Sequence, residues 1–547
     1  MYLYGKSPWI LILLLTSMSG VWKSCARLEQ RENYHGDQWL SHGRDLTNNR
    51  WARYEKQISV ATVQQLKKKW TFTTDGDATA TPSVTDGVVY FPDWAGSLYA
   101  VKQNTGELVW KKNLTALAAA SLGSGNKTLL SRSTPTIDGD QLLVGIFGPC
   151  AVLALNRSDG ALLWSKVLDP HPYGVVTMSG TVYEGYLYIG SSSGEEGSTT
   201  TCCSFQGAFF KLDIKSGAVV WRVLMMPDNG GRSDQYAGNG LWGSSPPIDV
   251  RRREVYIATG NNYQTPEEVV QCELNYRNLT NPPIPDPCID PDNHLESVLA
   301  INIDSGNITW AHRLGGYDTW IITCTIPLPG YVNCPPIPGP DYDFGEAPLL
   351  LTIPTNKSYH GNHGRDIVVV GQKSGIVWAL DRVTGETVWE TQAGPGGTSG
   401  GSTWGITTDG QRVFTMIVNN FRENFTLVPS TTVITSGGWV GLNASSGQVL
   451  WSTASPNGEL NPAALTHANG LVFGGSTSGM VILDSRSGEI LRSVPTNGSV
   501  WGGASVSRGC SFQPVGLTPT SAAVAVISNR TVLHGNSVVS LCSPSAV

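Results

Sequence analysis

The sequence predicts an all-β fold: an eight-bladed β-propeller whose blades are four-stranded antiparallel sheets docked by tryptophans. Two observations predict it. One short segment recurs seven times along the 547 residues, and the chain contains 62 glycines and 18 tryptophans but only 15% charged residues. Such a composition suits short strands joined by tight turns. Regular repeats across nearly the whole chain favour a closed ring over two half-barrels or a pair of sandwiches.

The repeated unit is two strands joined by a turn. In the copy "ALDRVTGETVW", which ends at Trp389, an apolar strand meets a polar turn whose glycine permits positive φ, and a second strand ends on tryptophan. The other copies end at Trp110, Trp164, Trp221, Trp310, Trp451 and Arg492, where the tryptophan is lost. A further strand pair between copies makes each repeat a four-stranded sheet. The tryptophan offers a flat surface for docking one sheet on the next.

The two ends of the chain supply the eighth blade. "LKKKWTF", Leu66 to Phe72, reads as a strand without a preceding turn, and the C-terminal region supplies strands without a terminal tryptophan. Joining them in one sheet closes the ring and removes exposed strand edges. We therefore expect the propeller to span residues 61–547, after an N-terminal extension over residues 27–60.

Two insertions rich in proline and cysteine interrupt the repeats, at about residues 263–297 and 318–348. Stiff excursions of this kind usually lie at one mouth of a ring and shape access to it. For the first insertion, surface decoration is an alternative interpretation.

Residues 1–26 are predicted to be a secretory signal peptide. Lys6 precedes an apolar run from Trp9 to Leu15, and Ser24-Cys25-Ala26 fits a cleavage site. The run is short for a membrane span, and an uncleaved anchor is the alternative. The chain is therefore expected to be secreted and to lack a membrane span.

Charge and sequons agree with an extracellular protein. The net charge of −6 and the absence of a basic run argue against nucleic-acid binding. Ten N-x-S/T sequons predict a glycoprotein, at Asn113, Asn126, Asn156, Asn278, Asn307, Asn356, Asn424, Asn443, Asn497 and Asn529.

Nine cysteines remain after Cys25, and an oxidising compartment would let them pair. The expected disulfide bonds are Cys272–Cys288, Cys324–Cys334 and Cys510–Cys542. The adjacent Cys202 and Cys203 either form a vicinal disulfide or each find another partner. Cys150 is left as a buried small hydrophobe.

The repeat resembles the tryptophan-docking repeat of the pyrroloquinoline quinone (PQQ) dehydrogenases. Other segments resemble their polyvinyl-alcohol-dehydrogenase-like branch over about residues 37–547: "WLSHGRDLTNNRWA", "SRSTPTIDG", "WGSSPPID", "ATGNNY" and "GGYDTW…DFGEAP". The resemblance implies a PQQ- and calcium-dependent oxidoreductase that oxidises a small or polymeric alcohol, secondary alcohols included, to a carbonyl. The chain has no C-x-x-C-H for covalent haem, so an external electron acceptor is implied.

The resemblance also implies metal ligands and a base. "SSGEEGS" puts a calcium ligand at Glu196, with Glu195 as the register alternative, and "ATGNNY" puts one at Asn261. "GGYDTW" makes Asp318 the candidate catalytic base. Asp341 and Asp343 are interpreted as groups that cap or fasten the second insertion. For Glu195 and Glu196, an exposed turn is the alternative.

Four more residues are implied as contacts of PQQ. In "QKSG", Lys373 corresponds to a lysine on the quinone oxygen; a solvated loop lysine is the alternative. Trp242 is the candidate flat partner of the quinone and Trp404 a second one, with blade docking as the alternative. Arg132 could bind a PQQ carboxylate, or serve structurally at a strand start.

Three departures from the family favour a rival interpretation or limit the transfer of roles. In the alcohol dehydrogenases of the superfamily a vicinal disulfide covers one cofactor face, but Cys202-Cys203 comes later in the repeats than in the methanol-oxidising relatives. We therefore do not transfer that role. The lost tryptophan at Arg492 and the missing haem segment fit a non-catalytic propeller, a secreted binding or scaffold protein. Convergence of the implied residues on one cavity would favour the enzyme.

Overall fold

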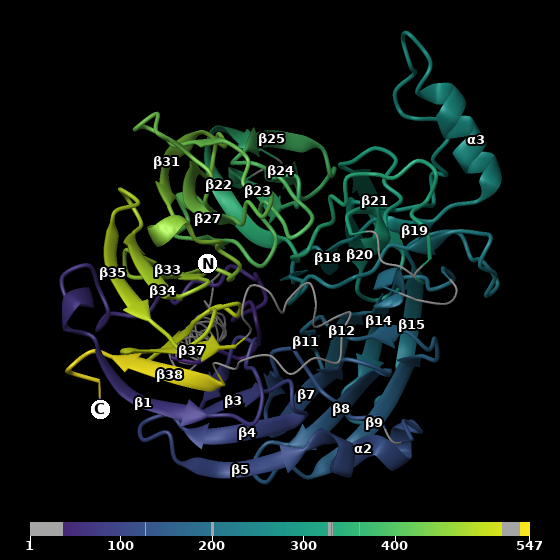
Figure 1. Ribbon diagram of the computed structural model, residues 1–547. Helices are drawn as coiled ribbons and strands as arrows, with labels where there is room; N and C mark the ends of the chain where they lie inside the picture. Colours follow the sequence, from purple (N-terminus) through teal and green to yellow (C-terminus); the bar gives the residue numbers. More distant parts are fainter. Residues whose placement is uncertain are drawn as a thin grey trace, which may run out of the picture.

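The computed structural model describes residues 37–125, 127–197, 202–326, 330, 332–359, 362–516 and 536–546, and in it eight four-stranded antiparallel sheets follow one another around a ring (Figure 1). The predicted eight-bladed propeller is confirmed. The predicted signal peptide, residues 1–26, lies outside the described residues. No helix in the described part of the chain has the length and apolar character needed to cross a membrane.

The blades are numbered along the chain, and the strands of blades 1 to 7 are hydrogen-bonded in sequence order from the axis outward. Blades 1 and 2 are β2 (Ser83–Thr85), β3 (Val88–Pro92), β4 (Ser97–Lys102) and β5 (Leu108–Asn113), then β6 (Thr136–Asp138), β7 (Gln141–Ile146), β8 (Cys150–Asn156) and β9 (Leu162–Asp169). Blades 3 and 4 are β11 (Thr181–Tyr183), β12 (Tyr186–Gly190), β14 (Ala208–Asp213) and β15 (Val219–Leu224), then β17 (Ile248–Asp249), β18 (Glu254–Ala258), β20 (Ser297–Asn302) and β21 (Ile308–Arg313).

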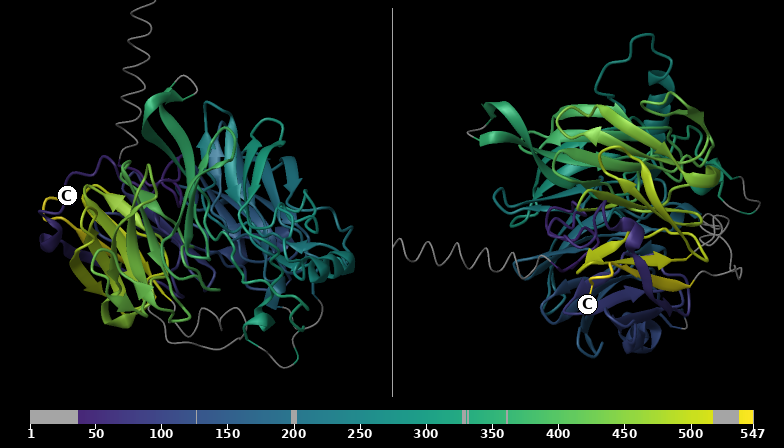
Figure 2. Two further views of the ribbon diagram at one scale, coloured as in Figure 1. Left: turned by 90° about the horizontal axis from the view of Figure 1, so that it is seen from above. Right: turned by 90° about the vertical axis from the view of Figure 1, so that its left-hand side faces the viewer.

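The second half of the ring repeats the pattern. Blades 5 and 6 are β22 (Leu349–Tyr359), β23 (Asn362–Gly371), β24 (Ile376–Asp381) and β25 (Thr387–Gln392), then β26 (Thr407–Thr408), β27 (Arg412–Ile417), β30 (Gly438–Asn443) and β31 (Val449–Ala454). Blade 7 is β32 (Thr466–Ala468), β33 (Leu471–Ser476), β34 (Gly479–Asp484) and β35 (Ile490–Pro495). The long β22–β23 hairpin reaches beyond its neighbours (Figure 2).

Blade 8 joins the two ends of the chain, as predicted. Its strands are β36 (Ser505–Ser507), β37 (Cys510–Val515), β38 (Ser537–Cys542) and, outermost, β1 (Lys67–Thr73). Trp70 of β1 pairs with Ser540 of β38, and Figure 1 shows the purple β1 beside the yellow β38. Because an N-terminal strand completes a C-terminal sheet, the ring has no free seam.

Each docking tryptophan bonds to the turn of the next blade. The indole N–H groups of Trp70, Trp110, Trp164, Trp221, Trp310, Trp389 and Trp451 each donate to a backbone carbonyl of the following blade, over 2.8–3.3 Å. Arg492, which replaces the tryptophan in blade 7, donates to the carbonyls of Val63 and Gln64 at the closing seam, both at 2.9 Å. The lost tryptophan is thus a substitution that keeps the inter-blade hydrogen bond.

The turn glycine packs against this tryptophan. Gly385 in blade 5 has φ +73°, and a Cβ added there would lie 2.6 Å from Cε3 of Trp310 in blade 4. The glycine is therefore needed both for its backbone conformation and for close blade contact.

We expect Gly385→Ala to lower the free energy of unfolding by about 2–4 kcal/mol, because backbone strain adds to a clash with Trp310. Gly87→Ala is the matched control: its φ is +76°, but nothing lies within 4 Å of an added Cβ. It should cost only about 1 kcal/mol. Urea unfolding of both variants checks this; equal losses would mean that the tryptophan contact contributes nothing.

An Asn or Asp recurs at the start of the turn in six of the blades. Its Oδ1 accepts a hydrogen bond from the backbone N–H two residues later, at Asn156, Asp213, Asn302, Asp381, Asn443 and Asp484. This geometry is an Asx turn. Two predicted sequons, Asn156 and Asn443, coincide with it, so the fold alone gives these asparagines a reason.

The N-terminal segment 37–52 closes one end of the ring. Its backbone bonds to blades 1, 2, 4, 5 and 7 in turn, through Trp39, Leu40, Leu46, Thr47 and Ala52. The buried Arg50 adds side-chain bonds to the Leu465 carbonyl and to Thr466. Because this one segment, folded in successive turns, touches five blades, it covers the axis at that end.

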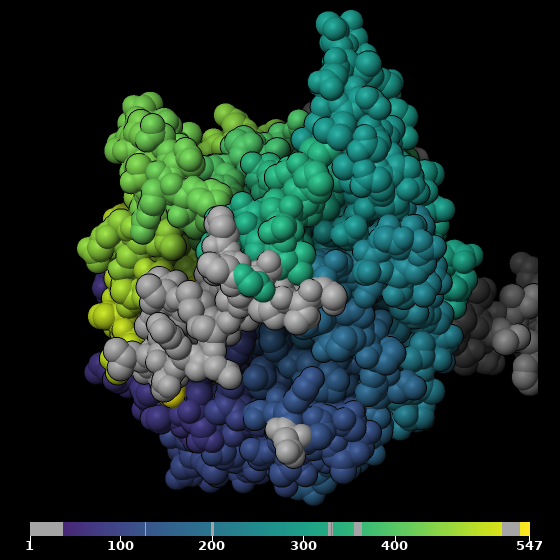
Figure 3. Space-filling model, turned by 45° about the vertical axis from the view of Figure 1, so that its right-hand side comes forward, coloured from purple at the N-terminus to yellow at the C-terminus, as the bar shows by residue number. Residues whose placement is uncertain are grey.

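The first insertion carries helix α3 (Glu267–Tyr276) and stands out from the surface (Figure 3). The short helix α2 (Leu114–Leu122) follows β5. Five two-residue strands, β10 (Gly174–Val175), β13 (Ser192–Ser193), β16 (Ala237–Gly238), β28 (Phe425–Thr426) and β29 (Val433–Ile434), pair outside the blades together with β19 (Asn262–Gln264). The described residues also form the 3-10 turns η1 (Val63–Gln65), η2 (Glu195–Gly197), η3 (Ile322–Cys324) and η4 (Pro456–Gly458).

The predicted cysteine pairing is confirmed. Disulfide bonds join Cys272 to Cys288, Cys324 to Cys334 and Cys510 to Cys542, and Cys150 is free and buried. The open choice at the adjacent pair is resolved: Cys202 bonds to Cys203.

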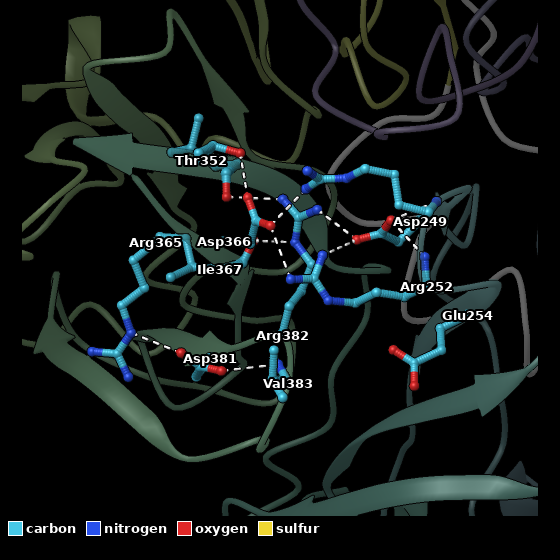
Figure 4. A network of polar contacts seen from close by, with 12 residues as sticks. Asp249, Arg252, Glu254, Thr352, Arg365, Asp366, Ile367, Asp381, Arg382 and Val383 are labelled. Carbon is cyan, nitrogen blue, oxygen red and sulfur yellow. Dashed lines mark hydrogen bonds and ion pairs between the residues drawn. The ribbon is translucent and has the colours of Figure 1, made fainter. Parts of the chain in front are cut away.

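A buried ion network joins blades 4 and 5 (Figure 4). Asp249 of β17 pairs with Arg252 at 2.6 Å and with Arg382 at 2.9 Å. Asp366 of β23 pairs with Arg252 at 2.9 Å and accepts a 2.6 Å hydrogen bond from Thr352 Oγ1. Burial opposes ionisation of both aspartates, but these arginine and hydroxyl contacts outweigh it and lower both pKa values.

We expect this network to destabilise the ring in acid. A carboxyl whose folded pKa is depressed stabilises the fold above its unfolded pKa of about 4, and that contribution is lost as the pH falls below it. Asp366→Asn should cost about 1.5–3 kcal/mol at pH 7 and flatten the loss of stability below pH 4. Asp304→Asn, at an exposed pair with Arg253, is the control. Unfolding from pH 3 to 7 checks this; parallel curves for wild type and Asp366→Asn would contradict it.

Candidate functional site

A cavity of about 350 Å³ lies on the ring axis. The segment that leads into each of the eight blades contributes to its wall, with Thr79, Thr134, Thr177, Ser244, Gly345, Trp404, Ala464 and Trp501 for blades 1 to 8. His42 of the N-terminal segment also lines it. Only a space on the axis can touch all eight blades, so ring closure gathers side chains from the whole chain.

Five of the seven predicted site residues line this cavity: Arg132, Glu196, Trp242, Lys373 and Trp404. The other two, Asn261 and Asp318, are buried but are not among its lining residues. Trp94 holds the same position in the blade 1 repeat as Lys373 in blade 5 and also faces the cavity. This loop position therefore points to the axis, and the residue type decides its chemistry.

Lys373 is a buried, paired cation. It follows β23, with 7% of its surface exposed, and its Nζ donates to Asp341 Oδ1 and Asp343 Oδ2, both at 2.8 Å. Burial would lower the pKa of Lys373, but the charges of Asp341, Asp343 and Glu196 outweigh it and raise the pKa. The alternative of a solvated loop lysine is wrong.

The structure separates the two adjacent glutamates. The Glu195 carboxylate accepts hydrogen bonds from the backbone N–H groups of Ser204 at 3.0 Å and Phe205 at 2.8 Å, so it fastens the loop after the vicinal disulfide. Glu196 instead lines the cavity and accepts no hydrogen bond from the described residues. Burial raises the pKa of Glu196 to about 7, against the opposing charge of Lys373. Glu196 is thus the carboxylate available to a cation.

Asp341 and Asp343 are functional candidates that the sequence interpretation missed. Both line the cavity beside Lys373 instead of only fastening the insertion. Burial raises the pKa of Asp341 well above its usual range, with the charge of Lys373 opposing. Asp341 has a positive φ of +63°, so the direction of both acids depends on a backbone turn that the sequence pattern does not reveal.

The second predicted metal ligand, Asn261, adjoins this acidic wall. Its backbone N–H donates to Asp343 Oδ1 at 2.6 Å, and its Nδ2 donates to the carbonyls of Asn262 and Trp320. Among the described residues nothing donates to its Oδ1. Glu196, Asp341 and Asp343 face the charge of Lys373, and Glu196 also faces that of Arg132, so the wall keeps an excess of negative charge. Hard oxygens of this kind suit a divalent cation such as calcium, but among the described residues the three carboxylates do not themselves form a cluster at metal-ligand spacing.

Asp318, the predicted base, is turned toward other protein groups. Its Oδ2 accepts a hydrogen bond from the backbone N–H of Tyr342 at 2.9 Å, and it shares a hydrogen bond with the buried Glu296 carboxyl. Burial raises the pKa of Asp318. A Cβ on Gly339 would lie 2.1 Å from Asp318 Oδ1, so the loop closes tightly over this carboxyl. Asp318 therefore holds the segment that presents Asp341 and Asp343.

The rest of the wall fits a flat anionic ligand. Lys373 Nζ lies 5.3 Å from the ring centroid of Trp242, which meets Trp404 edge-on at 5.5 Å. The Arg132 guanidinium lines the cavity and donates to no described residue, and burial lowers its pKa to about 10. The buried indole N–H groups of Trp404 and Trp501 lack partners among the described residues. Unsatisfied donors beside an aromatic face suit PQQ, which carries carboxylates on a flat ring system.

The vicinal disulfide lies behind this wall. Cys202 and Cys203 pack with Phe205, Tyr263 and Ile321, and of these Tyr263 lines the cavity. Neither cysteine is itself a lining residue. The disulfide therefore contributes no surface to the cavity itself.

The model of the PQQ_2 family, described as outer membrane protein assembly factor BamB, matches residues 20–224 and 295–533. This chain belongs to that family. Its relatives are alcohol dehydrogenases of the PQQ type, and it falls on their polyvinyl-alcohol-dehydrogenase-like branch, as its motifs predicted.

Two polyvinylalcohol dehydrogenases are among the most similar relatives. One, from a Pseudomonas species, is 29% identical over 81% of this chain and 65% of its own length. Another, from a Sphingopyxis species, is 27% identical over 84% of this chain and 67% of its own length. The chain thus spans about two thirds of the length of these curated relatives.

A solved structure shares the fold. The quinohemoprotein alcohol dehydrogenase ADHIIG from Pseudomonas putida superposes with a TM-score of 0.69 at 17% identity, over 94% of this chain and 81% of its own. At this identity the likeness establishes the propeller architecture and nothing about activity.

Proposed function

We propose that this protein is a secreted PQQ- and calcium-dependent oxidoreductase that oxidises an alcohol to a carbonyl and passes the electrons to an external acceptor. The observation that carries the proposal is the buried cluster on the axis: Lys373 bonded to Asp341 and Asp343, with Glu196 nearby, in a cavity lined by all eight blades. The relatives named as alcohol dehydrogenases support it.

The proposed roles follow from the contacts. Glu196, Asp343 and Asn261 would hold the metal ion, Arg132 a carboxylate of PQQ, and Trp242 and Trp404 its ring system. Bound PQQ would supply the ortho-quinone that accepts the two electrons of the oxidation. Lys373, kept protonated by its acidic neighbours, would donate a hydrogen bond toward a quinone oxygen.

Asp341 is the proposed proton acceptor in place of Asp318. A general base must reach the hydroxyl proton of the substrate, and Asp341 lines the cavity while Asp318 does not. The bond from Lys373 Nζ holds the Asp341 carboxylate in place. Asp318 is proposed to act through the loop that it fastens.

Secretion and glycosylation belong to the same proposal. Residues 1–26 as signal peptide, 27–60 as an extension and 61–547 as the propeller remain predictions, and the sequons at Asn113 and Asn278 lie at exposed positions. The alternative is a non-catalytic secreted scaffold, which the family model's description as an assembly factor favours.

Titration of PQQ and an assay of alcohol-dependent dye reduction, each with and without calcium, test the proposal. We expect saturable PQQ binding that needs calcium, and dye reduction only with both. Arg132→Met should weaken PQQ binding about 10-fold or more, as expected for a lost charged hydrogen bond. Arg232→Met, at an exposed pair with Asp234, is the control. If the folded protein does not bind PQQ, the proposal is wrong and the non-catalytic scaffold is the remaining function.

A further inference from the structure

A second hollow of about 240 Å³ opens from the cavity. The two spaces share Trp94, Phe147, Val175 and Gly194 as walls, and Pro172 and Tyr173 line the second hollow only. We call this second hollow the side groove. The described residues that line it carry no charged side chain, whereas the cavity wall beside it carries Arg132 and Glu196.

The aromatic walls of the side groove are held in place. The Trp94 indole N–H donates to Thr79 Oγ1 at 2.8 Å, and its ring lies 5.6 Å from that of Phe147 at 50°. The Arg132 guanidinium lies 5.9 Å from the Phe147 ring centroid, which marks the change from polar to apolar wall. Because the Trp94 N–H is already satisfied, the indole presents only apolar surface.

The groove is open where its glycines line it. Nothing lies within 4 Å of a Cβ added at Gly194, and at Gly148 such an atom would meet only Val175 and the Gly174 carbonyl, at 3.9 Å or more. The pairing of β10 with β13, Val175 opposite Ser192, fixes the groove beside the strand that leads to Glu196. An unfilled apolar space therefore lies at a set position relative to the acidic cluster.

We propose that the side groove is a substrate subsite that takes the unbranched apolar chain of an elongated alcohol, whose hydroxyl end lies in the cavity toward Asp341 and Lys373. Only the placement of the hydroxyl end rests on the proposed function; the binding of the apolar chain does not. A mostly apolar, aromatic wall without charge gains free energy from burying methylenes, whereas a polyhydroxylated chain would lose most of its water contacts there. The protein would thus prefer long-chain alcohols over ethanol.

The first test is a chain-length series from ethanol to 1-octanol in the dye-reduction assay. Burial of one methylene gives about fourfold in kcat/KM, so we expect a steep rise over the first several carbons. Phe147→Ala and Tyr173→Ala should each lower kcat/KM for 1-octanol about 10-fold or more and change that for ethanol less than twofold. Leu163→Ala, an exposed apolar residue on β9, is the control. Turnover without chain-length dependence would overturn the subsite.

The second test needs no turnover. Saturation-transfer NMR should detect contact of the 1-octanol chain with the wild-type protein, weakened in Phe147→Ala and Tyr173→Ala but not in Leu163→Ala. If these NMR differences are seen but the protein reduces no dye, the proposed function is wrong and the subsite is supported. Equal signals in all variants would overturn the subsite whatever the enzyme does. Circular dichroism shows that each variant is folded.

Discussion

Asp341→Asn should lower kcat by about 10²- to 10⁴-fold, the usual contribution of a positioned general base. The asparagine keeps the size of the side chain and an oxygen that can accept from Lys373 Nζ, now 2.8 Å from the carboxylate. It cannot take up a proton. PQQ affinity should therefore change little, and single-turnover reduction of bound PQQ by an alcohol measures the loss.

Asp318→Asn separates the two interpretations of the base. Asp318 fastens Tyr342 and shares a hydrogen bond with Glu296 behind the cavity wall, so its loss should reduce kcat only about 10-fold through misplacement of the loop. The pH profile of kcat/KM should keep its shape in this variant and lose its acidic limb in Asp341→Asn. If Asp318→Asn is the variant that loses both the rate and the limb, the base is Asp318.

The fold was predictable because its signals are local and repeated. A strand, an Asx turn, a glycine and a tryptophan recur together, and each copy alone indicates a hairpin. The strand around Trp70 could be assigned to the last blade because the C-terminal sheet lacks an outer strand ending in tryptophan, and a closed ring needs one. The disulfides followed from short spacings within insertions. The role of Arg492 could not be predicted, because the sequence does not reveal that two backbone carbonyls at the closing seam accept its hydrogen bonds.

The site was predictable only in part, for a different physical reason. Glu196, Trp242 and Lys373 belong to loops whose direction the repeat fixes, so their convergence follows from ring closure. Asp318 and Asp341 lie in an insertion without repeat or regular strand, where the chain path depends on a disulfide and on tight glycines. Sequence alone could not say which aspartate faces inward. The choice between Glu195 and Glu196 likewise depended on tertiary contacts, the hydrogen bonds from the Ser204 and Phe205 N–H groups to Glu195.

Lys373→Met should lower the free energy of unfolding of the metal-free protein by about 3–5 kcal/mol at pH 8, because it leaves buried carboxylates without their cation. Asp341, Asp343 and Glu196 would then repel one another within the cavity wall. Methionine conserves the length of the side chain, so the loss reports mainly on charge. Urea unfolding with a chelator present measures it.

The loss should depend on pH with a definite sign. Glu196 has a folded pKa of about 7, above its unfolded value. Its ionisation therefore destabilises the folded state at pH 7 and above, and this destabilisation disappears as the pH falls toward 4. Without Lys373 the penalty grows, and the difference between variant and wild type should shrink from pH 8 to pH 5. Lys373 itself adds no slope there, because its raised pKa keeps it protonated throughout.

Calcium should replace the missing charge. If Glu196, Asp343 and Asn261 form a cation site, millimolar calcium at pH 8 should restore much of the stability of Lys373→Met, since binding to the folded state alone stabilises it. Lys211→Met is the matched control: Lys211 is also buried, but its Nζ donates to the Ile303 carbonyl at 2.7 Å and lies over Tyr186. Its loss should be independent of calcium and of pH between 5 and 8. A loss in Lys373→Met that neither acid nor calcium relieves would mean that the acidic wall does not form a cation site.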